Sequence, residues 1–480
     1  PCEWVSSLCS WASFFVCVCV CVCVCVCCLK MGTPTVEEGD EGVVEEEPLL
    51  SQVCCLCSLQ HSPWVILGGQ GVDGGAMCQL FECVGYTQHL VLLWAVCISG
   101  GDEEEAEQTP ARNSDSTSSQ AERKEDEEQE EEIVVTSVVA VPVSDPAQDP
   151  ILCVSAGDQV LAWPLRRTLI AEEGTQVVGE ETPQVVSSED IAQTLFRVGR
   201  GVEINQMCVH STAKEGGKTL LLLADDNGTV TVLQLDMCQD GDPPIVTASV
   251  LHVFPLHSNI SLGLHVLPSD RSLRCVFVSS SLDGTCCLSQ ADPPACLLSL
   301  DMLTLLRNPC SQFLVNPPYV HSCAVVDPSG DGSALCVLCG CEDGTLTCTV
   351  VEAASPNKAK THNLLFAHRS AVTQICLLHD WKEDILVLTC GMDCRVRLWS
   401  LRHLQENPLC PGDLQGVGPD VEDINAALPM AQPLWEAEML GKVNCIHWAS
   451  HIQSVVVGMV SGDSRIIPLM FHADRASTPS

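Results

Sequence analysis

The chain has 480 residues and a formal net charge of −39, with 62 Asp and Glu against 23 Lys and Arg. Its length allows two or three ordinary domains or one large repeat domain. The acidic balance argues against direct binding of nucleic acid, because phosphate recognition needs clustered Lys and Arg. The 33 cysteines do not indicate a disulfide-rich secreted domain, since that class is short and these cysteines are unevenly spread.

The first 30 residues are dominated by an apolar stretch, residues 4–29, which is long enough to cross a bilayer. Its centre alternates Val and Cys strictly from Val16 to Cys27. An alternating G-T dinucleotide tract gives this product when it is translated in frame. We therefore interpret residues 1–30 as a translated non-coding repeat. A signal anchor is the alternative, and only that interpretation would attach the protein to a membrane.

Residues 31–132 form an acidic, cysteine-rich region that we predict to be disordered. Two tracts, residues 37–47 and 102–132, combine repeated Glu with few apolar side chains. Such tracts repel themselves and cannot bury enough apolar surface to offset the entropy lost on folding. They are expected to be solvated linkers.

Two patterns between these acidic tracts resemble ligand sites. Residues 69–74, Gly-Gln-Gly-Val-Asp-Gly, match the dinucleotide-binding glycine pattern, but no carboxylate follows about 20 residues later and no βαβ alternation surrounds it. Cys54, Cys55 and Cys57 lack a second ligand pair at the spacing of a zinc site. We assign no cofactor and no metal.

From residue 133 to the end, short apolar strands alternate with turn-forming residues, which is typical of an all-β domain. Self-comparison shows a recurring unit of two apolar strands, an Asp-containing turn and an alternating strand. The clearest copy spans Leu365 to Leu401. Five weaker copies follow the same order: residues 134–165, 204–235, 257–288, 322–346 and 443–469. Each unit would supply one four-stranded blade of a β-propeller. The sequence therefore shows six blades.

Three closely spaced cysteines, Cys336, Cys339 and Cys341, suggest a zinc site at first sight. In register with the other copies they lie on the second strand of a blade and its following turn. Successive side chains of a strand point to opposite faces and cannot converge on one ion. We interpret all three as core and turn residues.

The order of these units resembles the WD-repeat β-propeller family over residues 133–472. The resemblance rests on five segments: residues 203–205, 224–226, 257–260, 313–317 and 441–446. It implies seven blades, so that one blade would be missing before residue 133. It also implies a long polar insertion before the last blade, which residues 403–440 match. The predicted fold is a WD-repeat β-propeller at residues 133–480, after a disordered or artefactual N-terminal region.

WD blades contain a buried network of His, Ser or Thr, Asp and Trp. The resemblance places His368, Thr389, Asp393 and Trp399 in this network. We expect the network to be structural: the Asp orients the His ring, and the Trp buries a large apolar face while its N–H finds a partner. Catalysis by the same His and Asp is the alternative, but repetition around a ring explains them better. Ser289, Thr349 and Leu469 replace the Trp in other copies, which should rely on apolar packing.

The expected function is a protein-interaction scaffold and not an enzyme. Propeller rims carry loops on a rigid support, and no nucleophile–base pair, phosphate loop or paired-ligand metal motif occurs in the repeats. The resemblance implies a substrate receptor that docks on the damaged-DNA-binding adaptor of cullin-4 ubiquitin ligases, in the cytoplasm or the nucleus. The alternative is a WD-repeat adaptor in a chromatin or trafficking assembly.

Residues 399–402, Trp-Ser-Leu-Arg, resemble the Trp-Asp-x-Arg motif of such receptors, with Ser in place of Asp. Trp399 and Arg402 are therefore candidate adaptor contacts. The alternative is that Trp399 belongs to the core and Arg402 is a solvated loop charge.

Overall fold

The computed structural model describes fifteen segments of the chain: residues 50–58, 64–72, 75–84, 89–98, 133–143, 150–165, 184–187, 192–211, 218–238, 245–268, 274–305, 318–352, 359–378, 384–406 and 432–469. All of them belong to the second of two compact units, residues 49–480. The predictions for residues 1–30 and for both acidic tracts lie outside these segments. Within them, no helix is long and apolar enough to span a membrane.

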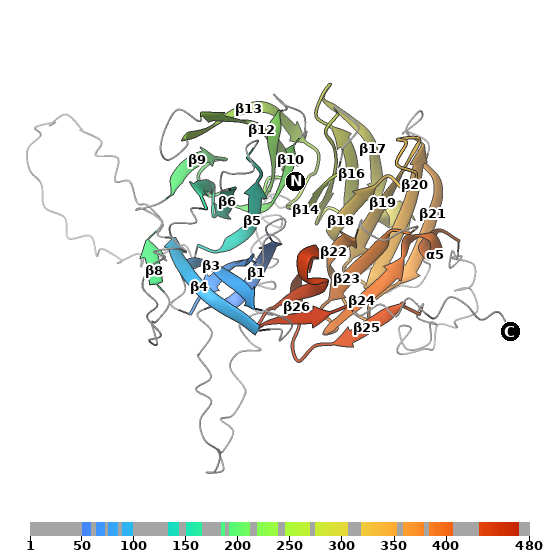
Figure 1. The fold of residues 1–480 in the computed structure, drawn as a ribbon. Coiled ribbons are helices and arrows are strands. Elements are labelled where there is room, and N and C mark those ends of the chain that lie inside the picture. Colours follow the sequence, from blue (N-terminus) through green and yellow to red (C-terminus); the bar gives the residue numbers. More distant parts are fainter. Residues whose placement is uncertain are drawn as a thin grey trace, which may run out of the picture. The chain divides into compact units, whose positions relative to one another are not determined.

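The described residues form seven β-sheets, named here blades A to G in chain order (Figure 1). Blade A contains β1 (Leu50–Ser58), β2 (Trp64–Gly71), β3 (Ala76–Val84), β4 (His89–Ile98) and, parallel to β4, β8 (Gln184–Ser187). Blade B contains β5 (Val135–Val141), β6 (Ile151–Ala156), β7 (Gln159–Pro164) and β9 (Gln193–Arg197). Blade C contains β10 (Ile204–Ser211), β11 (Thr219–Asp225), β12 (Thr229–Cys238) and β13 (Ile245–Pro255).

Blade D contains β14 (Ser261–Val266), β15 (Val276–Ser281), β16 (Thr285–Gln290) and β17 (Ala295–Asp301), followed by the short helix α4 (Met302–Leu305). Blade E contains β18 (Val320–Val326), β19 (Ala334–Cys341), β20 (Thr345–Glu352) and β21 (Ala359–Phe366). Blade F contains β22 (Val372–Leu378), β23 (Leu386–Gly391), β24 (Arg395–Ser400), α5 (Leu401–Glu406) and β25 (Trp435–Glu438). Blade G contains β26 (Val443–Ala449), the 3-10 helix η4 (Ser450–Ile452), β27 (Ser454–Met459) and β28 (Ser464–Pro468).

The blades are arranged as a closed ring. The first strand of each blade contacts the first strand of the next, and β26 of blade G contacts β1 of blade A. Seven clusters of buried apolar side chains match the seven junctions between neighbouring blades. At the closing junction Val53 and Leu67 pack with Cys445 and Val456. Each fully buried side chain of the size of Val or Leu contributes roughly 1.5–3 kcal/mol.

The second strand of a blade is an unbroken apolar run because neighbouring blades cover both of its faces. All seven residues of β11 and all six of β23 are buried. Alternating strands would expose one face to water, as antiparallel sheets commonly do. The runs therefore follow from the stacking of blades.

Asp-containing turns join the second and third strands of several blades, as the repeat pattern predicts. In blade C, Asp225 Oδ1 accepts hydrogen bonds from the backbone N–H groups of Asn227 and Thr229, each at 3.0 Å. Gly228 follows with φ of 73°, a left-handed conformation that favours glycine. A Cβ at Gly228 would lie 2.5 Å from the carbonyl oxygen of Asn259. The turn thus needs both its Asp and its Gly.

Blade A corrects the prediction of six blades. The ring has seven, and the expectation of disorder over residues 31–132 is wrong for the strands between Leu50 and Ile98. Gly69 and Gly71 of the apparent dinucleotide motif belong to β2, and a Cβ at Gly69 would lie 1.9 Å from the carbonyl oxygen of Gln52. A Cβ at Gly68, the residue before the motif, would lie 2.5 Å from Val135 of blade B. Close packing of strands and blades therefore explains Gly68 and Gly69.

Two predicted loops contain strands. Residues 403–440 include β25, the fourth strand of blade F, so the polar insertion lies within this blade and not before blade G. Residues 171–193 lie between two predicted copies of the repeat, and within them β8 adds a fifth strand to blade A. Both strands are only four residues long, too short for alternation to reveal them.

Candidate functional site

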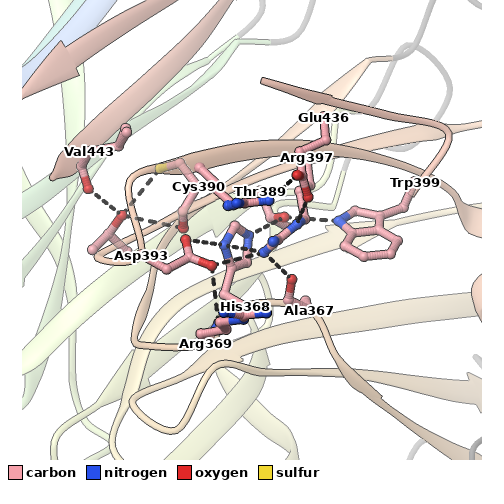
Figure 2. A network of polar contacts seen from close by, with 12 residues as sticks. Ala367, His368, Arg369, Thr389, Cys390, Asp393, Arg397, Trp399, Glu436 and Val443 are labelled. Carbon is pink, nitrogen blue, oxygen red and sulfur yellow. Dashed lines mark hydrogen bonds and ion pairs between the residues drawn. The ribbon is translucent and has the colours of Figure 1, made fainter. Parts of the chain in front are cut away.

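The four predicted network residues meet inside blade F (Figure 2). Trp399 on β24 donates through Nε1 to Thr389 Oγ1 on β23, over 2.9 Å. Thr389 Oγ1 lies 2.8 Å from His368 Nε2, and His368 Nδ1 lies 2.9 Å from Asp393 Oδ1 in the turn after β23. Facing strands and one turn therefore bring together residues that are far apart in the sequence.

Arg397 and Glu436 extend this network, and the sequence analysis missed both. Arg397 Nη1 donates to Asp393 Oδ2 at 2.9 Å and to the carbonyl oxygen of Ala367 at 2.6 Å. Arg397 Nε donates to Glu436 Oε2 at 2.6 Å. Because Arg397 precedes Trp399 by two residues on one strand, both side chains point to the same face. This two-residue spacing could have identified Arg397 from the sequence. Glu436 lies after a long insertion, so no fixed spacing from the repeat could have identified it.

Burial and hydrogen bonding shift the pKa values within the network. Burial lowers the pKa of His368, although Asp393 opposes this shift. Burial by itself would raise the pKa of Asp393, but the hydrogen bond and charge of His368, the backbone N–H of Arg369 and the charge of Arg397 hold it well below its usual range. The geometry fits a neutral His368 that donates through Nδ1 to an ionised Asp393 and accepts through Nε2 from Thr389.

The geometry of the network indicates a structural role. The side chain of His368 has no exposed surface, and both of its ring nitrogens have partners. A general base must reach the proton that it removes from a substrate. Among the described residues this His–Asp pair therefore has no open position for chemistry, and its hydrogen bonds join β23, β24, the turn between them and the loop before β22.

Blade D keeps part of the same network, more than its sequence predicts. His257 Nε2 lies 2.8 Å from Ser279 Oγ, and His257 Nδ1 lies 2.8 Å from Thr285 Oγ1. Thr285 Oγ1 in turn donates to Asp283 Oδ1 over 2.6 Å. Ser289 stands at the offset of the Trp and does not complete the network.

Blade B also has a Trp at this position of the sheet. A search for a Trp at a fixed number of residues after the turn Asp does not find it. Trp163 lies opposite Leu152, as Trp399 lies opposite Val387. The turn of blade B is shorter, with Ala156 paired to Gln159, so that the Trp comes sooner after the Asp. Trp163 is buried, but its Nε1 has no hydrogen-bond partner among the described residues.

Trp399 and Arg402, the candidate adaptor contacts, differ in accessibility. Trp399 is 1 % exposed and belongs to the core between blades E and F. Arg402 is exposed in the first turn of α5, and its backbone N–H donates to Asp384 Oδ1 over 3.3 Å. Ser400, which replaces the Asp of the motif, hydrogen-bonds the Asp384 carboxylate and accepts from the backbone N–H of His403 at 3.1 Å. Only Arg402 is thus presented at the surface.

The clustered cysteines lie on strands. Cys336, Cys339 and Cys341 are buried on β19, and the sulfur of Cys336 lies 3.2 Å from that of Cys348 on β20. Cys54, Cys55 and Cys57 lie on β1. Across the described segments, no three His, Cys, Asp or Glu side chains are arranged to hold a metal ion.

No protein-family model matches the chain, and no curated protein matches it in sequence. Solved structures with a similar fold include Sqt1 from Saccharomyces cerevisiae, with 12 % sequence identity, 88 % of this chain and 96 % of that chain covered, and a TM-score of 0.49. Sqt1 from Chaetomium thermophilum has 13 % identity, coverage of 89 % and 100 %, and a TM-score of 0.48. The same protein bound to the N-terminus of ribosomal protein L10 has 13 % identity, coverage of 87 % and 97 %, and a TM-score of 0.47.

Proposed function

We propose that this protein is a non-enzymatic scaffold that binds other proteins through the surface of its propeller. The observation that carries this proposal is the engagement of the His368–Asp393 pair in structural hydrogen bonds, with no exposed surface on the His side chain. Blades packed on both faces hold exposed loops and strand ends in fixed positions, and such positions are suited to recognition.

Within this function, we propose a substrate receptor that docks on the damaged-DNA-binding adaptor of cullin-4 ubiquitin ligases, in the cytoplasm or the nucleus. The motif order resembles WD repeat-containing protein 53, and residues 399–402 resemble the adaptor-binding motif. The local structure supports a role for Arg402: its side chain is exposed, while Asp384 holds the backbone of the turn. Ser400 accepts from a backbone N–H at the start of α5, as an Asp in this position would.

A charge reversal tests this docking. The variant Arg402→Glu should lower capture of the purified adaptor at least tenfold, because it replaces the cation that the motif would present to the adaptor with an anion. The matched control is Arg369→Glu, which reverses an exposed arginine at the opposite end of blade F, next to the Asp393 turn. The control should bind as well as the wild type.

The outcomes separate the possibilities. If Arg402→Glu captures the adaptor as well as the wild type, Arg402 is not a contact. If the wild-type protein captures no adaptor, the proposal of a ligase receptor is wrong. Affinity purification of the full chain followed by mass spectrometry would then identify the chromatin or trafficking assembly that the alternative function requires.

A further inference from the structure

Blade D has a cysteine and a serine at two positions that belong to the polar network in blade F. Ser289 follows Asp283 at the same distance in sequence as Trp399 follows Asp393. Ser279 pairs with Cys287 in blade D, as Thr389 pairs with Arg397 in blade F. Blade D therefore has a small hydroxyl in place of an indole and a thiol in place of a guanidinium. The Ser289 hydroxyl is buried and has no hydrogen bond of normal geometry within the described segments.

A β-bulge brings a second thiol to this place. Leu288 pairs with Leu298, but the next residue, Ser289, pairs with Cys296, so that Leu297 is extra on β17. Residues that face each other on neighbouring strands share a face, and so do residues two apart on one strand. Cys287, Ser289 and Cys296 therefore lie on one face of the blade. Without the bulge, Cys296 would point to the other face.

The two thiols differ in exposure and lie on the same face of neighbouring strands. Cys287 is 1 % exposed, whereas Cys296 is exposed on the outer strand β17. The Cys287 thiol donates to Ser299 Oγ over 3.6 Å, and Cys296 lies diagonally across from it, opposite Ser289. An accessible sulfur thus has a protected sulfur beside it.

Their surroundings favour opposite protonation states. The neighbouring Cys287 thiol, together with the Ser289 hydroxyl and the backbone of Leu298, outweighs burial and lowers the pKa of Cys296 to about 6. The neighbouring Cys296 sulfur, together with burial, raises the pKa of Cys287. At neutral pH the accessible group is a thiolate and the buried one remains a thiol. Oxidant-sensitive cysteines combine a stable thiolate, exposure and a neighbouring resolving thiol.

We propose that Cys296 is an oxidant-reactive thiol that forms a reversible disulfide with Cys287, with hydrogen peroxide as the oxidant. The Cys296 thiolate attacks one peroxide oxygen, the O–O bond breaks, and the leaving hydroxide takes a proton to become water. Cys287 then attacks the sulfur of the resulting sulfenic acid. The S–O bond breaks, and the departing oxygen leaves as water with the Cys287 proton. Two thiols are oxidised, one peroxide is reduced to two waters, and a dithiol reductant reverses the bond.

The disulfide would link β16 to β17 at the surface of blade D. Cys336 and Cys348 provide an internal comparison, because their sulfurs are only 3.2 Å apart but the residues are 0 % and 3 % exposed. Proximity alone would oxidise both pairs. If solvent access and thiolate formation determine the rate of oxidation, only the pair in blade D reacts while the protein stays folded.

Alkylation of the full-length protein tests the first step. At pH 6, Cys296 should react with iodoacetamide about tenfold faster than an ordinary exposed thiol, after allowance for the weaker nucleophilicity of a low-pKa thiolate. The partly exposed Cys394 is the reference within the same chain. Peptide mapping should give a rate profile for Cys296 with a midpoint near pH 6. A Cys296 rate no greater than that of Cys394 at this pH would overturn the proposal.

Oxidation tests the second step. After treatment with equimolar hydrogen peroxide, peptide mapping should show Cys287 linked to Cys296, with Cys336 and Cys348 still reduced. Cys287→Ser should accumulate a sulfenic acid at Cys296 that dimedone captures, Cys296→Ser should leave Cys287 reduced, and Cys394→Ser should behave as the wild type. The proposal fails if Cys296→Ser still oxidises at Cys287, or if Cys336 and Cys348 oxidise at the same rate. Unchanged circular dichroism and thermal unfolding midpoints would show that each variant is folded.

Discussion

Trp163 in blade B and Trp399 in blade F hold the same position in their sheets, but only Trp399 has a hydrogen-bond acceptor. The acceptor of Trp399 is Thr389 Oγ1, two residues along β23 from the residue that faces the Trp. The corresponding residue of blade B is Val154, which faces Leu161 and offers no polar side-chain atom. Trp163 Nε1 is therefore buried without a partner among the described residues.

This difference predicts unequal effects of the same substitution. Trp399→Phe removes a buried hydrogen bond and some volume, and should lower the free energy of unfolding by about 1–3 kcal/mol. Trp163→Phe removes a similar volume but also an unsatisfied donor, so that its net effect should be close to zero. Urea denaturation of both variants, monitored by circular dichroism, measures the difference. Equal losses of stability would show that the indole N–H does not matter in blade F.

Blade A should be necessary for a stable ring. Without residues 50–98, the apolar faces of blades B and G that pack against blade A would be exposed. Residues 133–480 expressed alone should therefore aggregate, whereas residues 49–480 should be monodisperse in size-exclusion chromatography. A monodisperse shorter fragment that unfolds as cooperatively as the longer one would contradict this prediction.

Acidification should destabilise the propeller below about pH 6.5, the pKa of an unfolded His. Burial lowers the pKa values of His257 and His368 in the folded state. The unfolded chain therefore binds more protons in this range, so the stabilising contribution is present above this pH and is lost as the pH falls. The temperature of the thermal unfolding midpoint should decrease when the pH is lowered from 8 to 5.5.

A double variant, His257→Gln with His368→Gln, isolates this cause. It should be less stable than the wild type at pH 8, because it loses hydrogen bonds, but its unfolding midpoint should change less with pH. His210, whose pKa burial also lowers, remains in both proteins and accounts for part of the residual dependence. An identical pH dependence in the two proteins would assign the effect to other groups.

Two matching turns have different residues in the left-handed conformation. Gly344 has φ of 84°, and a Cβ there would lie 2.1 Å from the carbonyl oxygen of His368. Gly344→Ala should therefore lower the free energy of unfolding by roughly 2 kcal/mol or more. Cys394 occupies the matching place in blade F with φ of 61°, which is strained for a residue with a Cβ.

Relief of that strain predicts a gain in stability. Cys394→Gly should raise the free energy of unfolding by up to about 1 kcal/mol, since the left-handed strain outweighs the added freedom of the unfolded chain. Urea denaturation of Cys394→Gly, with Cys394→Ser as the control for loss of the thiol, tests this. Equal stability of Gly and Ser at this position would contradict the prediction.

Features that depend on neighbours in the sequence were visible without coordinates. The apolar runs, the Asp-containing turns and the order of His368, Thr389, Asp393 and Trp399 follow from local backbone chemistry and strand periodicity. Because a blade is a local unit, its pattern of two apolar strands, an Asp-containing turn and an alternating strand recurs along the chain, and this recurrence indicated an all-β propeller.

Other features depend on which strands face each other, and the sequence does not contain that information in a local form. Blade A was missed because the glycines around β2 suggested a dinucleotide motif, whereas their close packing against β1 and blade B depends on strand pairing. Trp163 was not assigned to the Trp position because a shorter turn changes its offset, and Cys296 was missed because one bulge residue decides which face it occupies. A shift of one residue moves a side chain to the opposite face of a sheet, and only the pairing of strands sets that register.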